Sequence, residues 1–328
     1  MPGLHAHAPE ALDHVTRTCA WIDREMVIDV PTRRGMMAVF RRDSGALAHS
    51  LSTYGEWAEN EVAFLRHFIP AGGIVIDVGA YVGTHSLAFA EAAGPGGRVL
   101  AFEAQPDSYS LLVNNIALND AANVEACLGA VGGPDAADRV VIPRIDISGN
   151  CSFGSSSLTA GQVPTGGQEV VVPSIRLDSL TPPRCDLVKI DAEGMEPVIL
   201  QGAMDLLGRT RPVVYAECNS VDAGARVIDR LREAGMRVFI HVVDAFNPGN
   251  WRGRHNDIFQ GAKEVALLGV PSERMDAVTR IAPAPVERLI PVGTLDDLVV
   301  GMMLKPQYAR ELLRDAPVFR HPPVVQPA

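Results

Sequence analysis

The chain has 328 residues, of which 47% are hydrophobic, and a formal net charge of -10. This composition excludes wholesale disorder, and the acidic balance argues against a nucleic-acid partner or a basic membrane-binding face, because phosphate-rich surfaces bind basic proteins. No apolar run approaches membrane-spanning length. The five scattered cysteines favour free thiols, and the first residues lack the pattern of a secretory signal. We therefore expect a cytoplasmic protein.

Residues 1–52 are expected to form an N-terminal extension, in which the strand-like pieces MVIDVPT and MMAVFRR predict a β-hairpin. Residues 52–70 have apolar residues at spacings that suit a helix. Glu56 and Glu61 stand in its early turns, where carboxylates suit the helix dipole. We expect the histidines near the start of the chain to be solvated and not to bind metal. They are His5, His7 and His14.

Residues 74–84, IVIDVGAYVGT, have the pattern of a buried parallel strand that turns tightly into a helix. Gly79 and Gly83 form a Gly-x-x-x-Gly spacing, which differs from the dinucleotide fingerprint. The first glycine allows a positive φ at the turn, and the second allows a ligand to approach the helix start. Asp77 suits a cationic ligand with an amino group, such as S-adenosylmethionine. A structural strand–turn–helix unit without a ligand is the alternative.

A second strand, RVLAFEA, ends near Glu103. This acid follows Gly83 at about 20 residues, where a nucleotide-binding α/β unit places the carboxylate that binds ribose hydroxyls. The alternative is that Glu103 caps the next helix. Pro106 and Asp107 already supply that helix start, so the ribose interpretation is favoured.

Two long loops are candidates for contact with a substrate. Residues 143–168 are rich in Gly, Ser, Pro and Thr and predict either a substrate loop or a flexible excursion. Residues 245–260 join two strands and are too long for a hairpin turn, which predicts a lid over the pocket. The candidate substrate residues are Asn150, Phe153, Asn247 and Trp251 in these loops, and Asn219 at the end of a later strand.

Acidic residues follow two later strands. The segment DLVKI predicts a buried strand with Asp191 and Glu193 at its carboxyl end, and VVYAECN predicts a strand that ends in Glu217 and Asn219. Ligands of open α/β sheets lie outside the carboxyl ends of the strands. If the DLVKI strand pairs with the first strand, Asp191 and Glu193 should face the Asp77 turn. The alternative for the first of them is to cap the following helix.

Five strands with crossover helices, followed by a strand–loop–strand pair, predict an α/β fold. We expect a Rossmann-like, seven-stranded, mostly parallel sheet with helices on both faces and an antiparallel last strand. We divide the chain into an extension with a hairpin (1–52), a catalytic domain (53–274) and a C-terminal helical and Pro-rich appendage (275–328). The appendage is a candidate contact of a homo-oligomer.

Several segments, in this order, resemble the FkbM family of S-adenosylmethionine-dependent methyltransferases. The glycine turn alone indicates only a class I methyltransferase, whereas the segment KIDAEGME makes the resemblance specific. Tyr81 departs from the family, which commonly has Asn there. The matching segments are YGEWAENE, VIDVGAYVGTHS, FEAQPDS, SFGSSSL, DLVKIDAEGMEPVILQGA, VVYAECN and FNPGNWRGRHNDIF, which together span about residues 50 to 271.

The resemblance implies a class I methyltransferase fold, S-adenosylmethionine as cofactor and, most often, O-methylation of a hydroxyl on a sugar or a secondary metabolite. In such folds the turn acid and the first glycine lie near the methionine part of the cofactor, and the acid after the second strand binds the ribose. The residues that we expect around the cofactor are Glu56, Asp77, Gly79, Ala80, Tyr81, Gly83, Thr84, Glu103, Ala104 and Asp191.

An alcohol is a poor nucleophile until its proton is removed, so a base or a metal must help. The catalytic candidates are Asp191, Glu193, Glu217 and His241. The same carboxylates could instead hold Mg²⁺, which prefers oxygen ligands, and the sequence does not decide between the two. The rival functions are an NAD-dependent dehydrogenase, which the glycine spacing disfavours, and a non-catalytic binding or assembly protein on the same fold.

Overall fold

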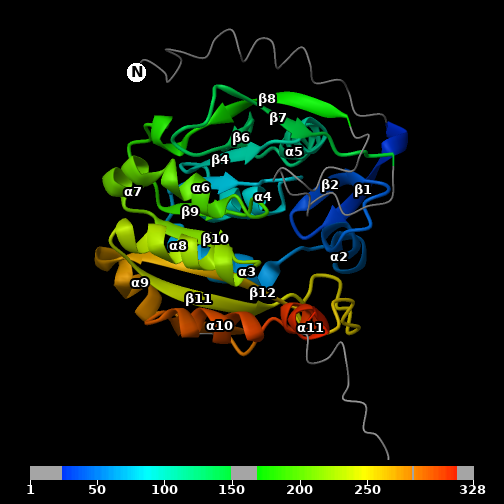
Figure 1. Cartoon of the computed structure of the whole chain (residues 1–328). Coiled ribbons are helices and arrows are strands. Elements are labelled where there is room, and N and C mark those ends of the chain that lie inside the picture. Colours follow the sequence, from blue (N-terminus) through cyan, green and yellow to red (C-terminus); the bar gives the residue numbers. More distant parts are fainter. Residues whose placement is uncertain (1–23, 149–167, 283, 316–328) are drawn as a thin grey trace, which may run out of the picture.

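The computed structural model describes residues 24–148, 168–282 and 284–315, and its central feature is an eight-stranded sheet (Figure 1). The strand order is β13-β11-β12-β10-β9-β3-β4-β5. The bounds of these strands in chain order are β3 (Ile74–Val78), β4 (Arg98–Glu103), β5 (Val124–Leu128), β9 (Leu187–Ile190), β10 (Val213–Glu217), β11 (Met236–Asp244), β12 (Lys263–Pro271) and β13 (Glu287–Pro291).

The strand directions match the expected Rossmann-like sheet. The strands β5, β4, β3, β9 and β10 pair in parallel, and β12 runs antiparallel to β10 and β11. The eighth strand, β13, was not expected, because its region was predicted to hold only helical pieces. It pairs antiparallel with β11. Pro285 and Pro291 flank its short apolar stretch and obscure the strand pattern, and a proline is tolerated there because β13 is an edge strand.

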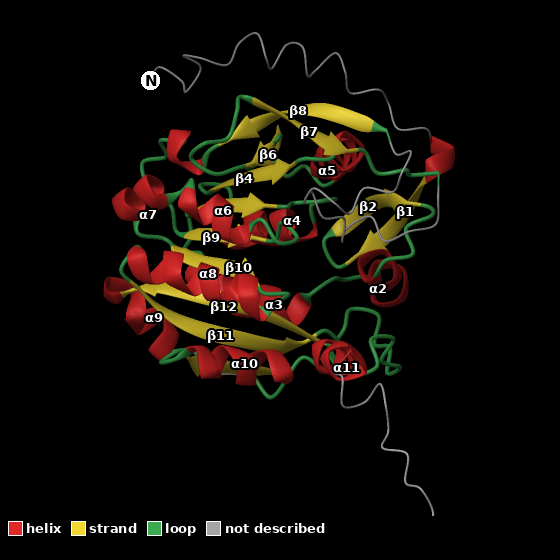
Figure 2. Ribbon diagram, in the orientation of Figure 1, coloured by secondary structure: helices red, strands yellow, loops and turns green. Residues whose placement is uncertain are grey.

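Helices cover both faces of the sheet, because its central strands are apolar on both sides (Figure 2). Val75 and Ile76 are neighbours on β3, both are fully buried, and they belong to different core clusters. The helices that pack into the Ile76 cluster are α6 (Glu196–Gln201), α7 (Met204–Thr210), α8 (Val221–Glu233) and α10 (Leu295–Met303). Those that pack into the Val75 cluster are α3 (Glu59–Leu65), α4 (Thr84–Ala93), α5 (Pro106–Leu118) and α9 (Met275–Thr279).

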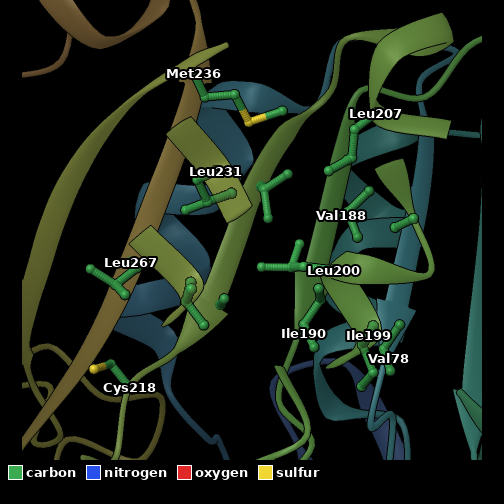
Figure 3. Close-up of a cluster of buried hydrophobic side chains, with 14 of the residues drawn as sticks. Val78, Val188, Ile190, Ile199, Leu200, Leu207, Cys218, Leu231, Met236 and Leu267 are labelled. Carbon is green, nitrogen blue, oxygen red and sulfur yellow. The ribbon is translucent and has the colours of Figure 1, made fainter. Parts of the chain in front are cut away.

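The Ile76 cluster fixes the end of β9, which matters for the site described below. Figure 3 shows Val188 and Ile190 of this strand beside Leu200 and Ile199 of α6, with Leu231 of α8 across the cluster. All five side chains are at most 1% exposed. Burying side chains of this size contributes about 1.5–3 kcal/mol each to the stability of the fold. The loop that follows β9 therefore starts from a rigid point.

Smaller elements flank the main sheet. The predicted hairpin is present as β1 (Val27–Thr32) and β2 (Gly35–Phe40). It is followed by α2 (Ala46–Tyr54), a helix that was not predicted within the N-terminal extension. A three-stranded sheet has the order β6-β8-β7. The remaining bounds are β6 (Ala130–Val131), β7 (Arg139–Pro143), β8 (Glu169–Ile175) and α11 (Pro306–Asp315).

Two further expectations concern the composition of the chain. Across the part of the chain that the structure describes, no helix combines the length and the apolar character needed to cross a lipid bilayer. Cys127, Cys185 and Cys218 are free thiols. The histidines expected to be solvated, His5, His7 and His14, lie outside the described residues.

Candidate active site

A cavity of about 310 Å³ lies where β3, β4, β9 and β10 end and β12 begins. This is the carboxyl edge of the parallel strands, where α/β sheets bind their ligands. Helices α3 and α4 close its sides with Ala58, Glu61, Thr84 and His85. The predicted site residues that line it are Gly79, Ala80, Tyr81, Thr84, Glu103, Ala104, Asp191, Glu193 and Glu217. The cavity therefore brings together most of the acids and the first glycine that the sequence singled out.

The glycine turn after β3 forms the floor of the cavity. Gly79 has φ +78°, and a Cβ built there would lie 1.8 Å from the carbonyl oxygen of Asp191. The amides of Gly79 and Ala80 both donate to the carbonyl of Phe102, at 3.0 and 2.9 Å. The turn thus touches the ends of β4 and β9 at once. It tolerates no side chain at its first glycine.

The second glycine has a different role from the expected one. Gly83 precedes α4 with φ +94°, and a Cβ there would meet Leu112 Cδ1 at 2.8 Å. It does not line the cavity. Its lack of a side chain lets α4 and α5 approach each other, so the prediction that it admits a ligand to the helix start is corrected.

Glu103 lies at the end of β4 with two backbone donors on its carboxylate. Oε2 accepts from the amide of Tyr81 at 2.8 Å, and Oε1 accepts from the amide of Gln105 at 2.8 Å. Burial raises the pKa of this carboxyl to about 7, against the effect of the backbone hydrogen bonds. Phe102, Ala104 and other apolar side chains line the adjacent part of the cavity. This end can hold hydroxyl groups beside a flat apolar ring.

Asp77 does not face the cavity, which corrects its expected role. It is fully buried and lies directly opposite Lys189 on β9 in the sheet register. Its Oδ1 is 3.4 Å from Lys189 Nζ, and its Oδ2 accepts from Ser86 Oγ at 2.6 Å. The Asp77 carboxylate, which was predicted to suit a cationic ligand, is therefore already paired with the ammonium group of Lys189.

Lys189 joins the turns after β3 and β9. Besides Asp77, its Nζ lies 3.3 Å from Asp191 Oδ2 and donates to the Gly79 carbonyl at 3.5 Å. Burial acts to lower the pKa of this ammonium, but the carboxylates of Asp77, Asp191 and Glu61 outweigh burial and raise it. The sequence showed Lys189 only as an interruption of an apolar strand. A lysine in a buried strand, two residues before an acid, was the signal of this ion-pair network.

Three carboxylates stand together beyond β9 and β10. Asp191, Glu193 and Glu217 each offer an oxygen within 4.8 Å of the others. Glu217 Oε2 is buried and has no hydrogen-bond partner among the described residues. The helix-capping alternative for Asp191 is not observed, because Met195 is the N-cap of α6 and no side-chain cap hydrogen bond is present. Glu196 Oε1 accepts the amides of Ala192 and Gly194 in the loop before this helix.

Crowding of negative charge shifts the protonation of this group. Burial and then repulsion from Asp191 raise the pKa of Glu193 to about 7 and raise the pKa of Glu217 well above its ordinary value. Burial also acts to raise the pKa of Asp191, but Lys189 outweighs it and holds that pKa below its ordinary value. Carboxylates at this spacing could share a proton or hold one divalent cation such as Mg²⁺.

His241, the fourth catalytic candidate, is sealed in the protein. Its side chain is 0% exposed and stacks on Phe64 with ring centroids 4.0 Å apart. Both ring nitrogens are occupied, Nδ1 by the Tyr215 hydroxyl at 2.9 Å and Nε2 by Glu287 Oε2 at 3.2 Å. It does not line the cavity, so it cannot touch a substrate there.

The predicted lid is a strap fixed to the N-terminal part of the chain. Glu56 accepts from Asn247 Nδ2 at 2.7 Å, from the Trp251 amide at 2.8 Å and from Arg33 Nε at 3.0 Å. No residue of 245–260 lines the cavity. The expected cofactor contact of Glu56 and the expected substrate contacts of Asn247 and Trp251 are therefore at odds with the geometry.

Three other substrate candidates are not placed in the cavity. Asn219 Oδ1 accepts from Lys305 Nζ at 2.9 Å, and Asn219 does not line the cavity. Asn150 and Phe153 lie outside the described residues, as does most of the loop that contains them.

The sequence analysis missed several polar side chains of the cavity. Glu61, interpreted as a helix-dipole residue, lines it together with His85, Tyr215 and Glu264. They come from α3, α4, β10 and β12, which are distant in sequence. A histidine directly after the glycine turn was the one local signal for this group.

The chain matches known proteins in part. Residues 77–238 match the family model of the methyltransferase FkbM domain. An arsenite methyltransferase of Halobacterium salinarum is 37% identical over 70 residues, which are 21% of this chain and 18% of that protein. The match thus spans about a fifth of that relative's length.

Solved structures show a distant likeness. A precorrin-6y C5,15-methyltransferase from Geobacter metallireducens is 16% identical, with TM-score 0.39, over 65% of this chain and 86% of that one. A methyltransferase FkbM from Methylobacillus flagellatus is 13% identical, with TM-score 0.37, over 61% and 44%. A SAM-dependent O-methyltransferase from Thermotoga maritima is 11% identical, with TM-score 0.42, over 76% and 88%.

Proposed function

Because this chain belongs to the FkbM family of methyltransferases, we propose that it methylates a hydroxyl group of a small molecule, a sugar or a secondary metabolite, with S-adenosylmethionine as the donor. The observation that carries the proposal is a single cavity that runs from Glu103 to the three carboxylates Asp191, Glu193 and Glu217. One end suits a nucleoside, and the other suits a positive charge and a reacting hydroxyl.

The residues of the cavity fit this cofactor. Glu103 presents a buried carboxylate beside apolar side chains, which suits ribose hydroxyls and an adenine ring. The absence of a Cβ at Gly79 lets the Asp191 backbone lie against the glycine turn, which brings the ends of β3 and β9 together at the cavity. Asp191 and Glu61 supply negative charge for a sulfonium and an amino group. When bound, S-adenosylmethionine supplies an electrophilic methyl group.

The protein's own contribution is positioning and charge. Transfer to oxygen is an in-line displacement, so holding the acceptor in the correct orientation lowers the barrier. Asp191 and Glu193 line the cavity, where they can accept a hydrogen bond from the acceptor hydroxyl and orient its oxygen.

Calorimetric titration with S-adenosylhomocysteine and, separately, with NAD tests the cofactor class. We expect binding of the first ligand only, weakened at least about tenfold by Glu103→Ala, which removes the acceptor of two buried amides. Binding of NAD alone would support a dehydrogenase. Binding of neither ligand would favour a non-catalytic protein on this fold.

An acceptor screen with isotopically labelled methyl donor tests the reaction. We expect label in small hydroxylated compounds such as glycosides. Turnover should be lost in Asp191→Asn and in Glu193→Gln, and S-adenosylhomocysteine binding should be retained in the second variant. Near-normal turnover in both variants would remove the carboxylates from the mechanism.

The same three carboxylates could bind Mg²⁺ instead of sharing a proton. Chelation with EDTA, followed by add-back of Mg²⁺, distinguishes these two arrangements. Lys189 already faces Asp191, so we propose that proton sharing prevails and expect activity to survive chelation. Activity that is lost on chelation and restored by Mg²⁺ would assign the carboxylates to a metal.

A further inference from the structure

His85 stands at the cavity wall in an arrangement typical of a base. It is the second residue of α4, lines the cavity and is 6% exposed. Its Nε2 lies 3.0 Å from Glu61 Oε1. A carboxylate on one imidazole nitrogen favours the proton at that nitrogen and leaves a lone pair on the other. The Glu61 carboxylate therefore points the lone pair of His85 away from itself, to Nδ1.

The second nitrogen of His85 is available to the cavity. Among the described residues Nδ1 has no hydrogen-bond partner, and it is not one of the buried unpaired atoms, so it is reached by solvent. The His85 side chain is among those that line the cavity. The His85 ring is thus held at one nitrogen and open at the other.

A buried chain of hydrogen bonds holds Glu61 in turn. Its Oε2 accepts from the Tyr215 hydroxyl at 3.0 Å. The Tyr215 oxygen also lies 2.9 Å from His241 Nδ1, in a hydrogen bond whose donor depends on the tautomer of the ring. Glu287 of β13 holds the far side of His241 at 3.2 Å. This series of hydrogen bonds runs from the edge strand β13 to the cavity. It gives the buried His241 a role in positioning Glu61.

Resting on the proposed methyl transfer, we propose that His85 is the general base that removes the proton of the acceptor hydroxyl, with Glu61 as the residue that orients it. In this step the hydroxyl O–H bond breaks and its proton passes to His85 Nδ1. The acceptor oxygen forms the new bond to the methyl carbon, and the carbon–sulfur bond breaks with its electron pair left on sulfur. Glu61 stabilises the imidazolium that results, as the carboxylate does in other carboxylate–histidine pairs.

The carboxylates and His85 have different roles at the acidic end of the cavity. Asp191 is engaged by Lys189 and so is a weak proton acceptor. A neutral imidazole that takes up a proton becomes a cation, which the carboxylates of the same cavity stabilise. The carboxylates then hold the acceptor hydroxyl while His85 receives its proton.

The first experiment needs no acceptor. Protein labelled with ¹⁵N in its histidine rings is measured by NMR at about pH 8, and the His85 signals are assigned from the spectrum of His85→Gln. We expect a neutral ring with its proton on Nε2 and a lone pair on Nδ1, and a mixture of the two tautomers in Glu61→Gln. A proton on Nδ1, or a ring still doubly protonated at that pH, would overturn the proposal.

The second experiment measures turnover with an acceptor from the screen. We expect His85→Gln to lower kcat by about 100-fold with the affinity for S-adenosylhomocysteine unchanged, because a general base contributes on that order. His49→Gln, on an exposed residue of α2, is the matched control and should keep the rate. Unchanged kcat in His85→Gln would refute the base role. Failure of the wild type to bind S-adenosylhomocysteine would instead refute the proposed function, while the tautomer result stays readable.

Discussion

The two ends of the cavity are built by different means. At the ribose end, Gly79, Tyr81 and Glu103 belong to two consecutive βα turns, and backbone hydrogen bonds hold them together. At the reacting end, the polar side chains come from α3, α4, β9, β10 and β12. The first end depends on backbone geometry, whereas the second depends on a balance of buried charges.

That balance explains the pKa directions at the reacting end. Glu61, Asp191, Glu193, Glu217 and Glu264 surround the cavity there, and Lys189 is the lysine among its lining residues. Burial acts to raise the pKa of each of these acids. The Lys189 ammonium outweighs burial at Asp191, and His85 and then Lys189 outweigh it at Glu61, whereas the pKa values of Glu193, Glu217 and Glu264 are raised. A substitution at the ribose end should act through sterics, and one at the reacting end through uncompensated charge.

The largest effect is expected at the ribose end from Gly79→Ala. The new Cβ would lie 1.8 Å from the Asp191 carbonyl oxygen at a φ of +78°. We expect a loss of at least about 3 kcal/mol in the free energy of unfolding and no measurable S-adenosylhomocysteine binding. Urea unfolding and calorimetry check both.

Gly194→Ala is the matched control for this steric argument. Gly194 has φ +98°, but no atom lies within 4 Å of the position that a Cβ would take there. The substitution should cost only the conformational strain, about 1 kcal/mol. Equal losses in the two variants would show that strain alone, and not the contact with Asp191, explains the effect.

At the reacting end, Lys189→Met should test the charge balance. Removal of the ammonium leaves the buried carboxylate of Asp77 without its partner, and we expect a loss of roughly 3–5 kcal/mol in the free energy of unfolding. The double variant with Asp77→Asn should recover a large part of this loss. If the two substitutions add without recovery, the pair is not the source of the stability.

The sequence predicts the ribose end of the cavity better than the reacting end. The strand–turn–helix at Gly79 and the carboxylate at Glu103 were predictable, because each depends on residues close together in the chain. The pairing of Asp77 with Lys189 depends on which strands become neighbours, as does the approach of Glu61 to His85. The role of Gly83 in helix packing depends on α5. Such contacts follow from tertiary structure and leave no local pattern.

The pH dependence of binding tests the role of Glu103 at the ribose end. Folding raises the pKa of Glu103 from 4.5 to about 7. Between these values the folded state binds more protons than the unfolded state, so this residue's effect on stability becomes less favourable as pH rises, by about 3 kcal/mol in all. Ribose hydroxyls donate to the ionised form, so ligand binding should favour proton release.

We therefore expect the affinity for S-adenosylhomocysteine to rise about tenfold between pH 6 and pH 8 and then to level off. Glu103→Gln should flatten both the binding profile and the stability profile over this range, while it keeps one acceptor oxygen. Calorimetry and urea unfolding at several pH values measure the two. A wild-type affinity that falls as pH rises would mean that the ligand binds the protonated carboxyl.

The smallest effect on binding is expected from Glu56→Gln, outside both ends of the cavity. Glu56 is buried, and its carboxylate joins Arg33 to the strap at Asn247 and Trp251. We expect a loss of about 1–3 kcal/mol in the free energy of unfolding and a dissociation constant for S-adenosylhomocysteine within about twofold of the wild type. Asn247→Ala removes one donor to the same carboxylate and should show a weaker form of the same pattern. A tenfold loss of binding at unchanged stability would show that Glu56 contacts the cofactor, as the family resemblance implied.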